Sequence, residues 1–298
     1  MIVVQLCGGL GNQMFQYATA KHLAKLNNSE LKIDTASFAA DKLRDYSLGV
    51  FKISASSASE EECNKLRFGT CNQTITKVIN HFRKISKRLC GKSFPRASSL
   101  VEEISYSYDP EILKRRGNLY LQGYWQTEKY FQPIRSLILA EFSINAAPDS
   151  NNLNLLAEIA ESNSVSLHVR RSDYVNDAKT QSVYVNCSID YYKKAVEIIK
   201  TRVAAPRFFI FSDDPDWAEK NLDFGNCRVV RGNDGDKSVE DLRLMAHCRH
   251  NIIANSSFSW WGAWLNTNAD KIVIGPAVWF KEKKFESSDR MPDAWIKI

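Results

Sequence analysis

Four short clusters of residues in this chain could bind a phosphorylated substrate. The first is the glycine-rich segment Cys7 to Gln13, which directly precedes a predicted helix. Glycines at such a position let backbone amides approach a phosphate, and the helix N-terminus adds about half a positive charge. We therefore expect Gly9, Gly11 and Asn12 to face an anionic ligand. A purely structural tight turn would have the same composition and stays open as an alternative.

The same segment begins a dinucleotide-binding pattern. Gly9 and Gly11 have the spacing of its first two glycines, and Asp34 follows roughly twenty residues later, where that motif places a ribose ligand. Met14, however, occupies the third glycine position, and its side chain would hold the helix away from the strand. The sequence therefore favours a phosphate site over a nicotinamide site, with Asp34 capping the end of its strand.

The second cluster extends from His168 to Tyr174, at the end of a predicted strand. Side chains alternate along a strand, so His168 and Arg170 lie on one side and Arg171 on the other. The two arginines must then have different roles. Arg170 could form bidentate bonds with a diphosphate, and a structural ion pair with Asp173 is the alternative for either arginine.

The third cluster, Ser212 to Asp216, supplies three carboxylates after another strand. One of them can cap the next helix, which Pro215 would begin. Another could accept hydrogen bonds from the donors of a guanine ring. Alternatively, Asp214 and Asp216 have the D-x-D spacing of a site for a divalent metal that bridges a diphosphate.

The fourth cluster is Asn255 to Trp261, again between a strand and a helix. Small hydroxyl groups at a helix start are ordinary N-caps, but two adjacent serines, Ser256 and Ser257, can also hold a phosphate. Phe258 follows them and is included in the same predicted site. The tryptophans beyond it have helical spacing, which favours a place in the core.

Strands that alternate with helices must position these clusters. Apolar, β-branched runs recur between amphipathic stretches of about ten residues in the second half of the chain, a pattern typical of a parallel, doubly wound sheet. Ligands of such sheets lie beyond the carboxyl ends of the strands, where the clusters are found. The predicted strands are 165–169, 207–211, 227–230, 251–254 and 271–274, and the predicted helices are 190–201 and those that begin near Pro215, Ser238 and Ser257.

The first half of the chain begins in the same way, with a strand over 2–6, a helix over 12–26 and a strand over 31–34. From there to Arg116 the sequence is polar and irregular, and we expect excursions from regular structure. Proline and small polar residues at 147–150 mark a boundary. The sequence therefore predicts an N-terminal domain over 1–148 and a C-terminal domain over 149–298.

Composition limits the class of protein and its compartment. With 298 residues, of which 44% are hydrophobic, the chain can fill two cores. No apolar run approaches the ~18 residues of a membrane span, and the first residues lack the features of a signal peptide, so we expect a cytoplasmic protein. The seven cysteines include no C-x-x-C pair and are expected to be reduced thiols.

The net charge of +6 suits an anionic small ligand at least as well as nucleic acid, and no nucleic-acid partner is expected. Basic residues concentrate in the stretch 77–92, where they alternate with apolar residues at helical spacing. Such a stretch could make a weak, peripheral contact with the inner membrane surface. The alternative is a solvated helix whose apolar face packs on the domain.

Together these clusters resemble glycosyltransferase family 11, the α-1,2-fucosyltransferases, in its bacterial form. The resemblance spans nearly the whole chain and depends on the segments 8–17, 168–174 and 241–266. It implies a GT-B-like α/β fold, in which two Rossmann-like, doubly wound lobes face a central cleft. The lobe 1–148 would bind the acceptor, and the lobe 149–298 would bind GDP-fucose. Ser172 stands where many relatives have glycine, which alters only the freedom of the loop.

The resemblance also implies roles for the clusters. Arg170 would bind the diphosphate of the donor, and His168 would lie near the nucleotide. An aspartate of the third cluster would read guanine, and for this role we prefer Asp214 to Asp213. The rest of the implied donor-binding set is Gly9, Gly11, Asn12, Asp213, Asp214, Ser256, Ser257 and Phe258.

The implied reaction is inverting transfer of L-fucose from GDP-β-L-fucose to the 2-hydroxyl of a terminal β-galactoside, in an oligosaccharide or a glycolipid. Arg170 and helix N-termini would stabilise the charge on the departing GDP, without a metal or another cofactor. Asp173 is the candidate general base, with Asp177 behind it, and bracing an arginine is the alternative for Asp173. Two other enzyme classes stay open: a metal-dependent glycosyltransferase of other donor specificity, and a nicotinamide-dependent sugar-nucleotide oxidoreductase.

Overall fold

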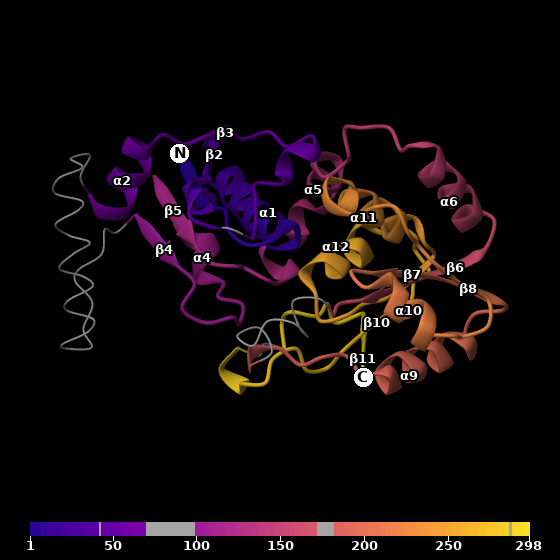
Figure 1. Cartoon of the computed structure of the whole chain (residues 1–298). Coiled ribbons are helices and arrows are strands. Elements are labelled where there is room, and N and C mark those ends of the chain that lie inside the picture. The colour runs from indigo at the N-terminus through magenta and orange to yellow at the C-terminus, as the bar shows by residue number, and fades with distance from the viewer. Residues whose placement is uncertain (42, 70–98, 172–181, 286–287) are drawn as a thin grey trace. The chain divides into compact units, whose positions relative to one another are not determined.

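The computed structural model describes the chain apart from residues 42, 70–98, 172–181 and 286–287. It contains two compact units, Met1–Ser143 and Ile144–Ile298, each built around its own parallel sheet (Figure 1). This confirms the prediction of a GT-B-like α/β chain with two Rossmann-like lobes. The central cleft and the assignment of acceptor and donor to the two lobes stay predictions.

The first unit has a five-stranded sheet in the order β3-β2-β1-β5-β4, and its strand pairs are parallel. The strands β1 and β5 near its centre carry mostly apolar side chains and are mostly buried. The strands are β1 (Ile2–Gln5), β2 (Leu31–Asp34), β3 (Ser56–Ser57), β4 (Leu100–Glu102) and β5 (Leu119–Gln122). The helices are α1 (Leu10–Leu26), α2 (Glu60–Phe68), α4 (Glu111–Lys114) and α5 (Arg135–Glu141), with short 3₁₀ turns η1 (Ala36–Ala39), η2 (Leu48–Val50), η3 (Glu128–Tyr130) and η4 (Gln132–Ile134).

The second unit has a six-stranded sheet in the order β11-β10-β9-β6-β7-β8, again with parallel pairs. Its strands are β6 (Asn163–Val169), β7 (Pro206–Ser212), β8 (Cys227–Val229), β9 (His250–Ile252), β10 (Val273–Gly275) and β11 (Ile296–Lys297). Its helices are α6 (Ser150–Ala160), α9 (Ile189–Lys200), α10 (Pro215–Asn221), α11 (Ser238–His247) and α12 (Ser257–Leu265), with 3₁₀ turns η5 (Gly235–Lys237) and η6 (Lys283–Phe285).

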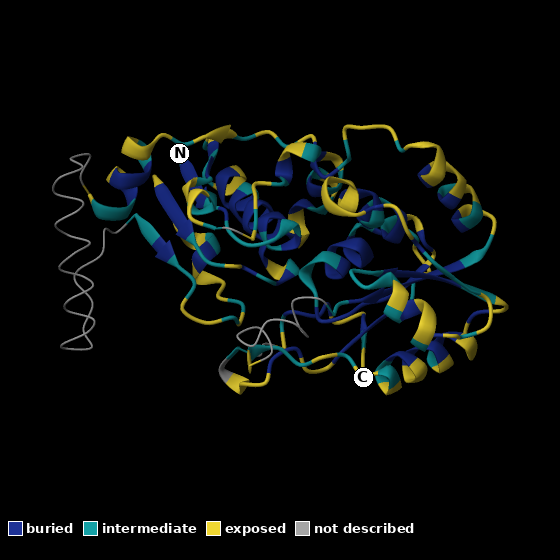
Figure 2. Cartoon of the chain, viewed as in Figure 1, coloured by how far each residue is buried: buried dark blue, intermediate teal, exposed yellow. Residues whose placement is uncertain are grey.

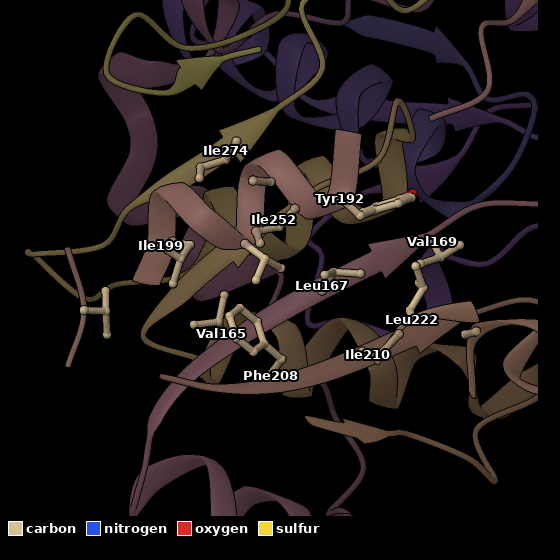
Figure 3. Packing of buried hydrophobic residues seen from close by; sticks show 14 residues of the cluster. Val165, Leu167, Val169, Tyr192, Ile199, Phe208, Ile210, Leu222, Ile252 and Ile274 are labelled. Atoms are coloured by element: carbon tan, nitrogen blue, oxygen red, sulfur yellow. The ribbon is translucent and has the colours of Figure 1, made fainter. Parts of the chain in front are cut away.

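The central strand β6 is buried on both of its faces. Val165, Leu167 and Val169 point into an apolar cluster with Tyr192 and Ile199 of α9 (Figure 3). In the burial view, the strands of this sheet are mostly dark blue, whereas α9 shows exposed positions on one side (Figure 2). Polar residues alternate with apolar ones along β6, whereas residues 208–211 of β7 form the continuous apolar run that is typical of strands in a parallel sheet covered on both sides.

The opposite face of β6 carries buried polar groups that are bonded to the layer of α11 and α12. The Nδ2 of Asn251 donates to the Ser166 hydroxyl at 2.7 Å and to the Met245 carbonyl at 2.8 Å. The Nδ2 of Asn266 in turn donates to the Asn251 side chain at 2.8 Å. Alternation along β6 therefore separates an apolar face from a polar face, and His168 lies on the polar one.

The predicted strands and helices of the second unit are present, and α1 begins at Leu10 rather than at Asn12. The five described cysteines are free thiols, as predicted. The stretch 77–92 lies outside the described residues. Within the described part of the chain, no helix combines the length and the apolar character that crossing a bilayer requires. The cytoplasmic location stays a prediction.

Close packing between α11 and α12 makes Gly262 sensitive to substitution. A Cβ at this position would lie 2.9 Å from the Cβ of Met245. We expect Gly262→Ala to lower the free energy of unfolding by about 1–3 kcal/mol, because the added methyl group overpacks the contact. Urea unfolding would measure it. Gly49→Ala is the control, since its Cβ would meet only Tyr46, at 3.7 Å. Equal effects of the two variants would refute this explanation.

Candidate active site

The glycine-rich segment forms a tight turn from β1 into α1. Gly8 has φ +74, in the left-handed region that favours glycine. A Cβ there would lie 2.7 Å from the Nδ2 of Asn12. Gly9 is the N-cap residue of α1, and its carbonyl accepts from the amides of Asn12 and Gln13 at 2.9 and 3.1 Å. The predicted residues Gly9, Gly11 and Asn12 therefore lie together in one turn.

Two fully buried glutamines of α1 hold this turn from inside. Gln13 donates to the Gly8 carbonyl at 2.9 Å, and Gln16 accepts from the Cys7 amide at 3.0 Å. Gln16 also donates to the Cys7 thiol, whose pKa is raised mainly by burial. These bonds fix the turn at the start of α1, which has no side-chain cap.

Residues from two distant segments approach the turn. The Nε and Cδ of Arg44 lie 4.0 Å from the place that a Cβ on Gly9 would occupy. The loop that carries Arg44 is tied to α1 through Gln13, which donates to the Asp45 carbonyl at 2.9 Å. Gln126 donates to the Oδ1 of Asn12 at 2.8 Å. Arg44 and Gln126 were not predicted, because their sequence positions alone do not reveal that they lie here.

In the second unit, the ends of β6 and β7 carry an arginine–aspartate cluster. We use this name for Arg170, Arg171, Asp213 and Asp214. The Nη1 of Arg170 lies 3.0 Å from the Oδ2 of Asp213, and the other oxygen of Asp213 accepts from the Arg171 amide at 2.8 Å. Asp213 thus fixes both the guanidinium of Arg170 and the backbone that follows it.

Arg171 has a different environment from Arg170, as the alternation along β6 predicts. Its guanidinium carbon lies 3.8 Å from the centre of the Trp217 ring, and its Nε lies 3.4 Å from Asp214. Asp214 also caps α10, since its Oδ1 accepts from the Trp217 amide at 3.1 Å. Asp214 therefore has two structural contacts, and its predicted role in reading guanine stays a prediction.

His168 lies beside this cluster on the polar face of β6. It is 5% exposed, and its ring centre lies 5.9 Å from that of Phe258. The pKa of His168 is lowered to about 4, mainly by burial; the charge of Asp213 opposes this shift, and the charge of Arg170 adds to it. His168 is therefore uncharged near neutral pH. Its Nδ1 has no hydrogen-bond partner among the described residues.

The two serines of the fourth cluster lie at the start of α12. Ser256 is the N-cap residue, but no side-chain hydrogen bond caps this helix, and Ser257 is its first residue. The Nδ2 of Asn255 donates to the Trp279 carbonyl at 3.1 Å and anchors the preceding loop. The structure thus brings His168 and Phe258 together, and it leaves the phosphate contacts of both serines as a prediction.

Other predicted residues lie elsewhere or were not described. Asp173 and Asp177 lie outside the described residues. Asp34 caps its strand as predicted, because it accepts from the Ala36 amide at 2.9 Å and from the Tyr120 hydroxyl at 2.5 Å. Asp216 forms an ion pair with Arg231 at 2.8 Å.

Comparison with known proteins then identifies the family. The family model "Glycosyl transferase family 11" matches residues 111–298. The chain belongs to glycosyltransferase family 11. It is 34% identical to an alpha-1,2-colitosyltransferase of Escherichia coli, over 100% of this chain and 99% of that protein.

Two further relatives have related names. The chain is 33% identical to the O-antigen biosynthesis glycosyltransferase WbnK of Escherichia coli, over 98% of this chain and 99% of that protein. It is 26% identical to the galactoside 2-alpha-L-fucosyltransferase SEC1 of Bos taurus, over 87% of this chain and 62% of that protein. The family 11 resemblance seen in the sequence is therefore confirmed.

Within this family 11 chain, sequence reasoning missed a buried polar network near the loop after β8. The side chains of Asn152 and Asn233 bond each other reciprocally at 2.9 and 3.0 Å. Asn233 also donates to the Oδ1 of Asp241 at 2.8 Å. Burial raises the pKa of Asp241 to about 7. The segment 241–266 contributed to the family resemblance, but its residue types alone do not indicate these partners.

The low pKa of His168 predicts a pH effect on stability. An unfolded histidine binds its proton near pH 6.5, whereas folded His168 binds it near 4, so the wild type loses stability as the pH falls between these values. Between about pH 7 and pH 5, we expect wild type to lose about 2 kcal/mol more than His168→Gln. Urea unfolding at both pH values measures this difference, and parallel losses in the two proteins would contradict the assignment.

Proposed function

We propose that this family 11 glycosyltransferase transfers L-fucose from GDP-β-L-fucose to the 2-hydroxyl of a terminal β-galactoside, with inversion and without a metal. The fucosyl donor and the galactoside acceptor are supported by the family resemblance and by the name of the bovine relative. The single observation that carries the proposal is the contact between Arg170 and Asp213 at the ends of β6 and β7.

This contact makes the guanidinium of Arg170 suited to stabilise negative charge on a departing nucleoside diphosphate. An inverting transfer is a single displacement, in which negative charge builds on GDP as the bond to the sugar breaks. A guanidinium that is already fixed by a carboxylate needs little reorganisation when that charge develops. Arg170 would therefore act on the transition state, and Asp213 would position it.

The neutral state of His168 fits the same proposal. A buried, uncharged imidazole whose Nδ1 has no partner among the described residues can form one hydrogen bond with a polar group of the nucleotide. Phe258 packs beside it and restricts its ring. The contacts of Ser256 and Ser257 with phosphate and the role of Asp173 as general base belong to this proposal as well.

The carboxylates of the D-x-D alternative have other contacts. Asp214 caps α10 and lies next to Arg171. Asp216 forms an ion pair with Arg231, and its side chain is largely exposed. A metal at this position would have to compete with two arginines. We therefore assign to Arg170 the role of balancing the negative charge of the diphosphate.

The kinetic consequence of this assignment is measurable. With GDP-fucose and lactose, we expect Arg170→Ala to lower kcat by roughly 10²–10³-fold, because charge on GDP is then unbalanced in the transition state. Arg171→Ala is the matched control, since it changes the same residue type one position away, and we expect a smaller loss. Thermal melting verifies that both variants fold.

The same assay tests metal independence. Transfer by the wild type should be unchanged by EDTA. Activity that EDTA abolishes and Mn²⁺ or Mg²⁺ restores would move the chemistry to the aspartates, and equal losses in the two arginine variants would remove the special role of Arg170.

A second donor is favoured by the colitosyltransferase relative. Colitose is L-fucose without its 3-hydroxyl, so both nucleotide sugars would present the same diphosphate to Arg170. We expect GDP-fucose to be the better donor by at least about tenfold in kcat/KM if the enzyme hydrogen-bonds the 3-hydroxyl, because a buried polar group would lose its partner with colitose. Competition between equimolar GDP-fucose and GDP-colitose measures this ratio. A preference for GDP-colitose would overturn the fucosyl assignment and keep the rest of the mechanism.

A further inference from the structure

Exposed apolar side chains of the first unit concentrate beyond the carboxyl ends of its strands. Leu43 and Tyr46 follow β2, Ile104 follows β4 and Tyr124 follows β5. Among the described residues of this unit, the remaining large exposed apolar side chain is Leu26, at the far end of α1. The carboxyl ends of parallel strands lie at one edge of the sheet. Four of these five side chains therefore belong to segments that leave the sheet at the same edge.

Tyr124 belongs to a turn that is fixed by several contacts. The carboxylate of Glu103 accepts from the amides of Tyr124 and Trp125 at 2.7 and 2.9 Å. Gln16 donates to the Gly123 carbonyl at 3.2 Å. A Cβ on Gly123 would lie 2.4 Å from the Cβ of Glu103, so only glycine fits there. The turn is therefore held from β4, from α1 and by its own close packing.

Two unfavourable features are retained in the same turn. Trp125 has φ +56, which is a rare conformation for a bulky residue. Its side chain is fully buried, and its indole N–H has no hydrogen-bond partner among the described residues. Both features cost stability, and such costs are concentrated at functional sites. The turn thus holds Tyr124, the residue before Trp125, in place at a cost in local stability.

The side chain held in this way is Tyr124, and it lies beside the glycine-rich turn. Its hydroxyl hydrogen-bonds the thiol of Cys7, while 37% of the residue stays exposed. Gln126, two residues after Tyr124, donates a hydrogen bond to the side chain of Asn12 at 2.8 Å. An exposed aromatic side chain in a rigid turn, bordered by amides, matches what a sugar ring needs: an apolar face for its C–H groups and hydrogen-bond partners for its hydroxyls.

We propose that Tyr124 is the aromatic platform on which the terminal sugar ring of the acceptor stacks, and that it selects a β-galactoside. This inference rests on the proposed function. The axial 4-hydroxyl of galactose leaves the C–H bonds of C3, C4 and C5 together on one face, which gives an apolar patch of about the size of a phenol ring. Glucose, with an equatorial 4-hydroxyl, has no such continuous patch. Tyr124 therefore acts in acceptor binding, and other residues contact the diphosphate.

The test compares binding of lactose and GDP in the full chain. We expect Tyr124→Ala to raise the KM for lactose at least about tenfold, since the stacking face is lost, with the KM for GDP-fucose and the Kd of GDP unchanged within about twofold. Tyr124→Phe keeps the ring but loses its bond to Cys7, and should retain most of the affinity. Leu26→Ala removes a comparably exposed side chain away from the turn and should change neither constant.

Binding of lactose is also measured directly, by saturation-transfer NMR without donor. The expected result is transfer to H3, H4 and H5 of galactose in the wild type and its loss in Tyr124→Ala, with an unchanged melting temperature. If the wild type binds lactose in this way but transfers nothing from GDP-fucose, the proposed function fails and this inference stands. A lactose affinity that survives Tyr124→Ala, an equal loss of GDP affinity, or no lactose binding by the wild type would overturn the inference.

Discussion

The register between β6 and β7 is the constraint on which the candidate donor site depends. The two strands pair in parallel over seven residues, from Asn163 with Pro206 to Val169 with Ser212. The next residue of each strand is then Arg170 and Asp213, and these side chains meet at 3.0 Å. A shift by one residue would turn both away from each other, because side chains alternate between the faces of a sheet. The apolar cluster against α9 holds this register, since it requires Val165, Leu167 and Val169 on one face.

Much of this unit could be predicted from the sequence. The strand β7 contains a continuous apolar run because both faces of the sheet are covered, and the helices begin at or just after Ser and Pro residues that favour helix starts. The partners of the arginines could not be predicted in the same way. Arg170 and Arg171 contact carboxylates 43 residues away in sequence, at the end of the next strand, whereas Asp173, the local alternative, lies outside the described residues. Only the strand pairing brings them together.

The first unit was less predictable for a related reason. The predicted glycine turn and α1 are local features, whereas β4 and β5 are short strands within or after a polar region. The residues that complete the turn come from far along the chain: Gln126 is 114 residues from its partner Asn12, and Glu103 is 21 residues from Tyr124. The buried Gln13 and Gln16 illustrate the same limit. Polar residues in a helix suggest an exposed face, yet here they serve as internal hydrogen-bonding groups.

The arginine–aspartate cluster has equal numbers of positive and negative side chains. This composition produces little net electric field, so the cluster does little to attract small anions from solution. Inorganic phosphate or chloride would have to displace a carboxylate from an arginine that is already satisfied. A nucleoside diphosphate brings more charge and two phosphate groups in fixed relation, and can compete where a single ion cannot. With Arg170 in the proposed donor-binding role, the cluster would discriminate among anions by valence and shape, and inorganic phosphate would compete poorly with the donor.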